Sequence, residues 1–282
     1  MGQSRGSRLA EWVRRRFRDS DFRFWARLQY ELIYLWPTGG RYSTFNFGTT
    51  PADPDIVPEG SRAEDRLQLQ LYRDLFRFGE AAGLPDAPLR LVEVGAGLGG
   101  GLDALARIAA FESLVGIEPA RSACFLGRRR FRVDLRRATA EATGLPDASC
   151  NMLMVVDSLS AFPNLRGFFE EMGRVLTPGA LVLFAMQEPR ETGVAPGWIG
   201  GFGRHVGLRV VAERAITDNV RRALRDDQPR RARMVLRVPF FLRSYARELF
   251  VLEGSVRYAE VVDGRRSYFF VALRKDGPEP QS

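Results

Sequence analysis

The residues best suited to chemistry form a glycine-rich stretch at positions 91–101, which reads LVEVGAGLGGG. Glycine at this density lets the backbone approach a bound group closely. The stretch lies between an apolar run and a helical pattern, where backbone N–H groups and a helix N-terminus face the ligand in parallel sheets. Glu93, two residues before Gly95, suits a ligand with a cationic centre or an ammonium group and would repel a pyrophosphate. The stretch therefore predicts a small-cofactor site.

Three acids further along the chain also lie at or after the ends of predicted strands. Glu118 ends the second predicted strand, where a carboxylate can accept hydrogen bonds from both hydroxyls of a ribose. This feature fits a nicotinamide dinucleotide and S-adenosylmethionine equally. Glu141 and Ala142 precede the fourth strand, where an acid can take an adenine amino group. Asp157 ends that strand and is the best remaining ionisable group for a catalytic role. The acid at Glu141 supports an adenosyl ligand.

These residues need a scaffold, and apolar runs alternate with helical patterns from about residue 88. Strands are expected at 89–95, 114–119, 133–138, 151–157, 180–187 and 208–216, with helices at 101–111, 121–131 and 165–176. Such alternation predicts an α/β fold, with a parallel sheet covered by helices on both faces. A basic helical segment at roughly 218–250 follows, and a strand at 267–275 is expected to close the sheet as an edge strand.

The N-terminal part differs from this core. Residues 1–36 show apolar residues at helical spacing among arginines, which indicates one or two amphipathic helices. Helices packed on their own domain are favoured over a membrane surface. Residues 41–60 form a loop in which aromatic side chains surround Asn46. Four segments are expected: 1–87 with helices and lid loop, 88–216 as cofactor-binding core, 217–250 as helical lid insertion, and 251–282 with the closing strand.

Composition sets further bounds. The chain has 282 residues, 45% of them hydrophobic, and a formal net charge of +8. Two cysteines cannot build a disulfide framework, and no apolar run is long enough to span a bilayer, so a cytoplasmic protein with at most peripheral membrane contact is expected. No nucleic-acid-binding signature is present, and one histidine with no ligand-like cluster predicts no metal. The oligomeric state is left open.

The motifs together resemble a known family. VEVGAGLGGG, GIEP, EATGLPDAS, VVDSLSAFP and RVLTPGALVLFA follow one another as in class I S-adenosylmethionine-dependent methyltransferases. FNFGTTPADPD, QLYRDL, AITDNV, PFFLRSYAREL and SYFFVALRKD resemble the small-molecule branch that methylates lipids and polyketides. Within that branch the pattern resembles the phthiotriolone and phenolphthiotriolone dimycocerosate methyltransferases of mycobacteria. The resemblance covers most of the chain after residue 30.

The resemblance implies a fold and a set of site residues. The fold would be a Rossmann-like, seven-stranded, mostly parallel sheet whose last strand is antiparallel. A lid formed by the N-terminal helices, the 41–60 loop and the 218–250 segment would close over a hydrophobic small-molecule substrate and exclude water. Residues implied at the S-adenosylmethionine site are Glu93, Gly95, Ala96, Gly97, Gly99, Glu118, Pro119, Glu141, Ala142 and Asp157. Residues implied at the substrate are Phe45, Asn46, Phe47, Ser160 and Phe162.

The chain departs from the family after the fourth strand. The family commonly places one or two histidines where this chain has Ser160-Ala161, and a serine cannot act as base near neutral pH. The single histidine, His205, is expected away from the strand ends, and Asn151 is interpreted as a surface change. Three explanations remain for the missing histidine. Asp157 acts as the catalytic base, the acceptor is already acidic, or no methyl transfer occurs.

The third explanation would make the protein a cyclase or isomerase that keeps the cofactor as scaffold. A basic binding or regulatory protein with a relic pocket is a further alternative, against which the intact acids and glycines argue. The leading hypothesis is a methyltransferase that acts on an O or C nucleophile of a hydrophobic natural product. Within it, an acceptor of low pKa, or positioning without a dedicated base, is favoured.

Overall fold

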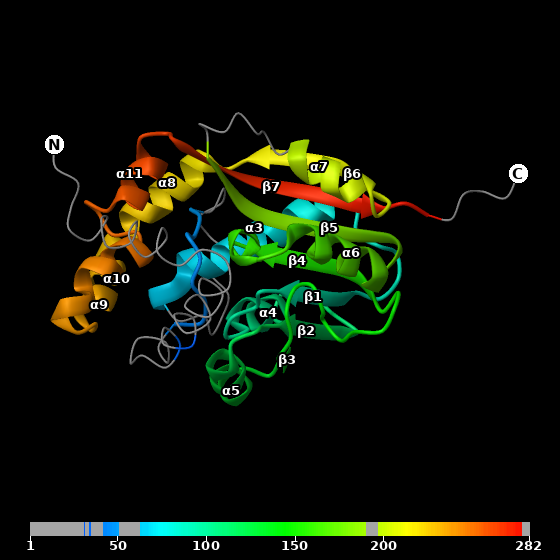
Figure 1. The fold of residues 1–282 in the computed structure, drawn as a ribbon, viewed down its shortest axis with the longest axis horizontal. Coiled ribbons are helices and arrows are strands. Elements are labelled where there is room, and N and C mark those ends of the chain that lie inside the picture. The colour runs from blue at the N-terminus through cyan, green and yellow to red at the C-terminus, as the bar shows by residue number, and fades with distance from the viewer. Residues whose placement is uncertain (1–30, 32–33, 35–41, 51–62, 190–196, 278–282) are drawn as a thin grey trace, which may run out of the picture.

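The structure is a computed structural model, and it describes residues 31, 34, 42–50, 63–189 and 197–277 (Figure 1). The amphipathic helices expected within residues 1–36 therefore lie outside the described residues, except at Glu31 and Tyr34. The described residues form a central sheet, helices on its two faces, the 42–50 loop and a helical insertion before the last strand (Figure 1).

A single seven-stranded sheet organises the chain. Its spatial order is β3 (Asp134–Arg136), β2 (Ser113–Ile117), β1 (Arg90–Val94), β4 (Cys150–Val156), β5 (Leu176–Pro189), β7 (Arg266–Lys275) and β6 (Leu208–Ala215). The strands from β3 to β5 pair in parallel, and β7 is antiparallel to both of its neighbours. The expected Rossmann-like sheet is confirmed.

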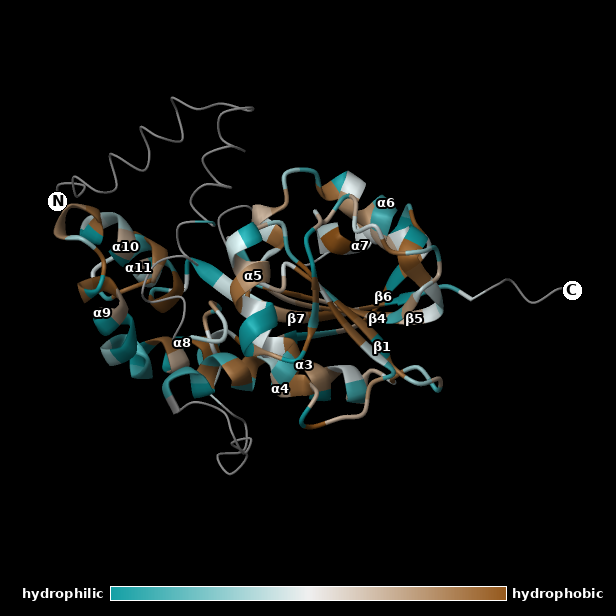
Figure 2. Cartoon of the chain, turned by 90° about the horizontal axis from the view of Figure 1, so that it is seen from below, coloured by the Kyte–Doolittle hydropathy of each residue, from teal (hydrophilic) through white to brown (hydrophobic). Residues whose placement is uncertain are grey.

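Successive side chains of each strand point to opposite faces of the sheet, so they lie in two hydrophobic cores, one on each face. Met152 and Met154 of β4 lie in the core that contains α3 (Arg66–Ala81) and α4 (Gly100–Leu105). Leu153 and Val155 lie in the core that contains α6 (Leu165–Val175) and α7 (Gly197–Arg204). Figure 2 shows these two helix pairs on opposite sides of the sheet. Strand β4 is buried along its whole length because helices cover both of its faces.

Two expectations about the sheet are wrong. Strand β7 is not an edge strand, because it lies between β5 and β6, and the more exposed β6 forms the edge. Its continuous apolar run at 268–273 is typical of a strand buried on both faces. Asn151 is not a surface residue either. Its side chain is buried, accepts the N–H of Arg90 at 2.8 Å and donates to the Pro88 carbonyl at 2.9 Å.

A helical cap separates β6 from β7. It comprises α8 (Thr217–Asp226), α9 (Gln228–Leu236), η4 (Phe240–Leu242), α10 (Arg243–Leu249) and α11 (Val256–Val262). Buried Asp227 pairs with Arg230 at 2.6 Å and with Arg231 at 2.8 Å. Arg231 also donates to the carbonyls of Phe47, at 3.0 Å, and Phe250, at 2.8 Å. This network joins the cap to the 42–50 loop.

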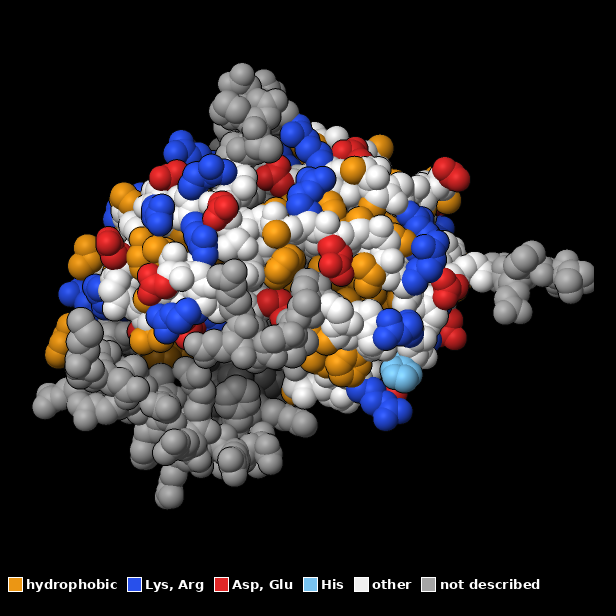
Figure 3. Space-filling model, turned by 90° about the horizontal axis from the view of Figure 1, so that it is seen from above, with side chains coloured by type: hydrophobic (Ala, Val, Ile, Leu, Met, Phe, Trp, Pro, Cys, Tyr) orange, Lys and Arg blue, Asp and Glu red, His pale blue; other side chains and the backbone are white. Residues whose placement is uncertain are grey.

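The surface charge is mixed. On the face seen in Figure 3, basic side chains lie singly or in small groups among acidic ones. Several arginines of the chain form exposed ion pairs, such as Arg166 with Glu170 at 2.9 Å. Exposed pairs of this kind contribute little to stability. The net charge of +8 is therefore not gathered into one continuous stripe on this face. Within the described residues, no helix is long and apolar enough to cross a membrane.

Candidate functional site

The glycine-rich loop turns sharply where β1 ends. The N–H groups of Gly95 and Ala96 both donate to the Ile117 carbonyl, at 2.8 and 3.1 Å. Gly95 and Gly97 have φ values of +81° and +56°, in the left-handed region that favours glycine. A Cβ at Gly95 would collide with Ser158, and one at Gly97 would lie 2.8 Å from the Tyr34 hydroxyl. The loop backbone thus packs directly against the carboxyl ends of β1 and β4.

Glu118, at the end of β2, is held by the loop. Its carboxylate accepts the N–H of Gly97 at 2.9 Å and the N–H of Ala120 at 2.8 Å. Burial raises the pKa of Glu118 to about 7. A carboxylate offers about four lone-pair sites, so each oxygen retains one for a ligand hydroxyl. The geometry fits the pair of ribose hydroxyls expected at this position.

Glu93, on β1, is fully buried next to Tyr72. Its Oε1 accepts the hydroxyl of Tyr72 at 2.7 Å, and its Oε2 has no partner among the described residues. Burial raises the pKa of Glu93 to about 8. A buried carboxyl oxygen without a donor is costly, and an ammonium or hydroxyl group of a bound ligand would relieve that cost. The residues present therefore fit a cofactor that carries a cationic group.

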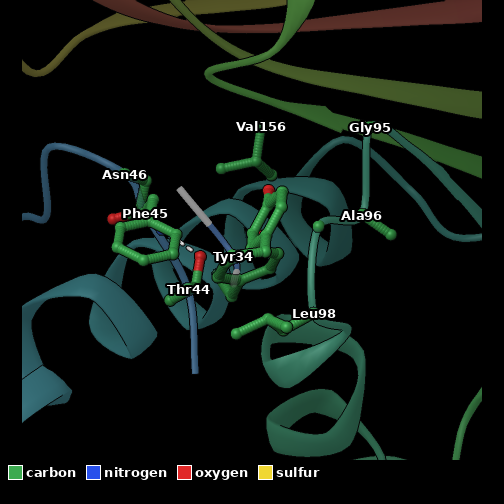
Figure 4. A pocket seen from close by; sticks show the side chains of 10 residues that line it. Tyr34, Thr44, Phe45, Asn46, Gly95, Ala96, Leu98 and Val156 are labelled. Atoms are coloured by element: carbon green, nitrogen blue, oxygen red, sulfur yellow. Dashed lines mark hydrogen bonds between the residues drawn. The ribbon is translucent and has the colours of Figure 1, made fainter. Parts of the chain in front are cut away.

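A cavity of about 40 Å³ lies between the loop and the 42–50 segment. It is lined by Tyr34, Thr44, Phe45, Asn46, Tyr72, Gly95, Ala96, Gly97, Leu98 and Val156. Figure 4 shows Tyr34 in the middle of this group, between Phe45 on one side and Leu98 on the other. Small-molecule sites usually enclose about 300–1,000 Å³. A nucleoside ligand would therefore require lining side chains to move, and Tyr34 occupies the space directly above Gly97.

Glu31 belongs to the same N-terminal segment as Tyr34. Its carboxylate accepts the N–H groups of Arg121 at 2.6 Å and Ser122 at 2.8 Å, at the start of α5 (Arg121–Arg130). This helix begins three residues after Glu118, whereas Tyr34 lies against Gly97 of the glycine-rich loop. Of the segment's two described residues, Tyr34 therefore lines the cavity and Glu31 contacts the start of the helix that follows Glu118.

Asp157 lies where β4 ends, with a φ of +54°. Its Oδ2 accepts the N–H of Phe47 at 2.9 Å, which ties the 42–50 loop to the sheet. Burial raises the pKa of Asp157, and donors that include Tyr268 and the Phe47 N–H offset part of the rise. Asp157 therefore holds the 42–50 loop against the end of β4.

The other predicted residues are spread around this centre. Ser160 is exposed on η2 (Leu159–Ala161), and the Phe162 ring packs against Phe168 at 4.9 Å. The Glu141 carboxylate accepts the N–H of Asn164 at 3.3 Å. His205 is exposed just after α7, on the connection to β6. Ala142 is exposed, Pro119 is half-buried beside Glu118, and neither lines the cavity.

Sequence reasoning missed two tyrosines. Tyr72 and Tyr34 line the cavity, although neither was proposed as a site residue. Tyr72 lies on the apolar face of α3, and a buried tyrosine hydroxyl needs a hydrogen-bond partner, which was the available signal. Tyr34 offered no comparable signal. Within the described residues, no group of three or more histidine, cysteine, aspartate or glutamate side chains could hold a metal ion.

Comparisons with known proteins show which proteins the chain resembles. A methyltransferase-domain family model matches residues 92–184, which run from β1 into β5. The chain is 27% identical over 205 residues to the fatty-acid O-methyltransferase of Mycolicibacterium smegmatis, covering 71% of this chain and 72% of that protein. It is 28% identical over 206 residues to a probable phthiotriol/phenolphthiotriol dimycocerosates methyltransferase 2 of Mycobacterium ulcerans, covering 71% and 76%.

A solved structure shows the same fold. The cyclase SpnF aligns with a TM-score of 0.68 at 18% identity, covering 89% of this chain and 97% of that chain. At this identity the likeness concerns the fold alone. The matched domain, the two relatives and the sheet order show that the chain resembles class I S-adenosylmethionine-dependent methyltransferases, among them enzymes named for lipid substrates.

Proposed function

We propose that this protein methylates an already acidic oxygen, such as a carboxylate, on a long-chain apolar acceptor. The observation that carries the proposal is the lack of a base where β4 ends. Ser160-Ala161 stands at the position where the family commonly has histidine, and Asp157 is engaged with the Phe47 N–H. A carboxylic acid with a pKa near about 4–5 is ionised at neutral pH, so it needs no base. The relative named as a fatty-acid O-methyltransferase supports this acceptor class.

The backbone at the glycine-rich loop supports the following arrangement of the cofactor. We place the adenosyl group along the glycine loop, with Glu118 at the ribose and Glu141 and Ala142 toward the adenine. Glu93 and Tyr72 face the amino-acid end, where the unpartnered Glu93 oxygen supports contact with an ammonium group. When bound, S-adenosylmethionine supplies an electrophilic methyl group on a sulfonium. The protein's own contribution is to position the acceptor oxygen in line and to remove its water.

Aromatic side chains favour an apolar acceptor. Phe45 lines the cavity and stacks on Phe250 with ring centroids 6.3 Å apart. Phe47 packs against Tyr268 at 6.1 Å, next to the carboxyl group of Asp157. We infer that Phe45, Asn46 and Phe47 form the lid over the acceptor, with Ser160 and Phe162 at its rim. The two cysteines, Cys124 and Cys150, are free and buried, which supports a cytoplasmic location.

A matched acceptor series tests the proposal. Three acceptors with the same alkyl chain would end in a carboxylic acid, a phenol and a primary alcohol. We expect kcat/KM to fall in that order, because the fraction ionised at neutral pH falls in that order. Equal or better turnover of the alcohol would show that the enzyme supplies a base and would refute the acidic-acceptor proposal.

The missing histidine also favours a second candidate, a non-methylating enzyme that keeps the cofactor as scaffold. This enzyme would convert its substrate by cyclisation or isomerisation within the same lid. The two candidates differ in whether S-adenosylhomocysteine accumulates with product. Product formed without S-adenosylhomocysteine would establish the second candidate.

A further inference from the structure

An exposed apolar surface lies on the helical cap, outside the candidate active site. Eight large hydrophobic side chains are exposed in the described part of the chain, and five of them fall between residues 236 and 245. We call this set the phenylalanine ridge; it consists of Leu236, Phe240, Phe241, Leu242 and Tyr245. Phe240 and Phe241, in the turn between α9 and α10, are 80% and 70% exposed. Such a concentration of exposed apolar side chains indicates an interaction surface.

Arginines surround the ridge. Residues 228–250 contain six arginines and a single acid; Arg230 and Arg231 are buried in ion pairs with Asp227, which leaves four arginines outside that network. Arg233 and Arg247 are exposed, and Arg243 directs its guanidinium to the carbonyls of Leu236 and Val238. The acid, Glu248, accepts the N–H groups of Val256 and Arg257 at the start of α11. The rim of the ridge is therefore positively charged.

The ridge connects inward to the cavity. On the inner side of α9 and α10, Met234, Val235, Val238, Ala246 and Phe250 form a core with Tyr42. Phe45 packs against this core and also lines the cavity. One apolar layer thus runs from the cavity, through the Phe45–Phe250 stack, to the helices that carry the ridge. These helices lie at the end of the molecule farthest from the C-terminal end of β7 (Figures 1 and 2).

We propose that the phenylalanine ridge docks the protein on the surface of an anionic lipid bilayer. Phe240 and Phe241 would enter the boundary between headgroups and acyl chains, and the arginines would contact anionic headgroups. The ridge is a helical turn and not a groove, and its two rings stand at 89° to each other. A projecting turn of this kind suits a fluid lipid surface better than a rigid protein partner. The docking itself does not depend on the acceptor proposed above.

Vesicle co-sedimentation tests the docking. We expect the wild-type protein to bind vesicles of phosphatidylglycerol and phosphatidylcholine. The Phe240→Ser/Phe241→Ser variant should bind at least about 20-fold more weakly, because burial of two phenylalanines is lost. Phe125→Ser is the matched control, because Phe125 is 51% exposed on α5, beneath Arg129 and outside the ridge. All variants should keep the wild-type melting temperature and affinity for S-adenosylhomocysteine.

A second pair of variants tests the charge. Arg233→Gln/Arg247→Gln should weaken binding to anionic vesicles by about 5-fold for each arginine removed. Arg166→Gln/Arg209→Gln, at two exposed arginines elsewhere, should change it little. Equal binding to pure phosphatidylcholine vesicles would overturn the proposal, as would equal losses in ridge and control variants. A wild-type dimer that the serine variant converts to a monomer would show a self-association surface and would also overturn it.

Discussion

Replacing Asp157 by asparagine should slow turnover by less than about 10-fold. The amide oxygen of asparagine can still accept the N–H of Phe47, which Asp157 accepts at 2.9 Å. Asparagine also tolerates the φ of +54° at this position. The change replaces a charge-assisted hydrogen bond by a neutral one, a loss of about 1 kcal/mol, or roughly 5-fold. Loss of a general base would instead cost about 10²–10⁴-fold.

Asp157→Ala is the informative companion. It leaves the Phe47 N–H without an acceptor and places an alanine at a positive φ. An unsatisfied buried donor costs about 1–3 kcal/mol, so the 42–50 loop should be ordered less often. We expect a higher KM for the acceptor and a lower melting temperature in alanine than in asparagine. Steady-state kinetics on both variants, with calorimetry of S-adenosylhomocysteine binding as control, measures the difference.

The pH dependence separates the two roles of Asp157. Burial raises the pKa of Asp157, so a catalytic Asp157 would lose activity as the pH falls through that raised value. The fall of kcat/KM at low pH that Asp157 causes in the wild type would then be absent from the pH profile of Asp157→Asn. We expect wild type and the asparagine variant to share the same profile. An asparagine variant that is at least about 100-fold slower while binding cofactor normally would refute this reasoning and make Asp157 the base.

The remaining predictions concern the cofactor site. Glu118→Ala should weaken binding of S-adenosylhomocysteine by roughly 1.5–3 kcal/mol in titration calorimetry, and NAD should not bind more tightly than S-adenosylhomocysteine. The pKa of Glu93 rises from 4.5 to about 8, so the folded, cofactor-free protein binds the extra proton and its unfolding free energy should fall as the pH rises between these values. In thermal melts across that range, the melting temperature of Glu93→Gln should change less with pH than that of the wild type. An equally steep pH dependence in both proteins would contradict this. EDTA should not reduce turnover; activity lost with EDTA and restored by Mg²⁺ would oppose that expectation.

The core strands were predictable because each is a short apolar run bounded by turns. The run at 151–157 became β4, and the parallel order followed from strand–helix alternation. The place of β7 was not predicted, because alternation along the chain does not say which neighbours a returning strand takes. Asn151 was misjudged because its partners, Arg90 and the Pro88 carbonyl, lie about sixty residues away in the sequence.

The site was predictable only in its local parts. The glycine turn and the acids at strand ends follow from the strand–helix alternation, and Glu118 contacts the loop at Gly97 because the parallel neighbours β1 and β2 end at the same edge of the sheet. The contact between Tyr72 and Glu93, and that between Phe47 and Asp157, depend on packing of separate elements. No spacing rule connects such pairs, so they could not be inferred from the sequence.

The most direct test of the central claim is a single-turnover reaction with methyl-labelled S-adenosylmethionine and a long-chain carboxylic acid. Mass spectrometry would quantify the labelled methyl ester and the S-adenosylhomocysteine formed. The account predicts that both accumulate in a one-to-one ratio and that the Asp157→Asn variant does the same. Conversion of the acceptor without S-adenosylhomocysteine, or no labelled ester from any apolar acid while alcohols are methylated, would contradict it.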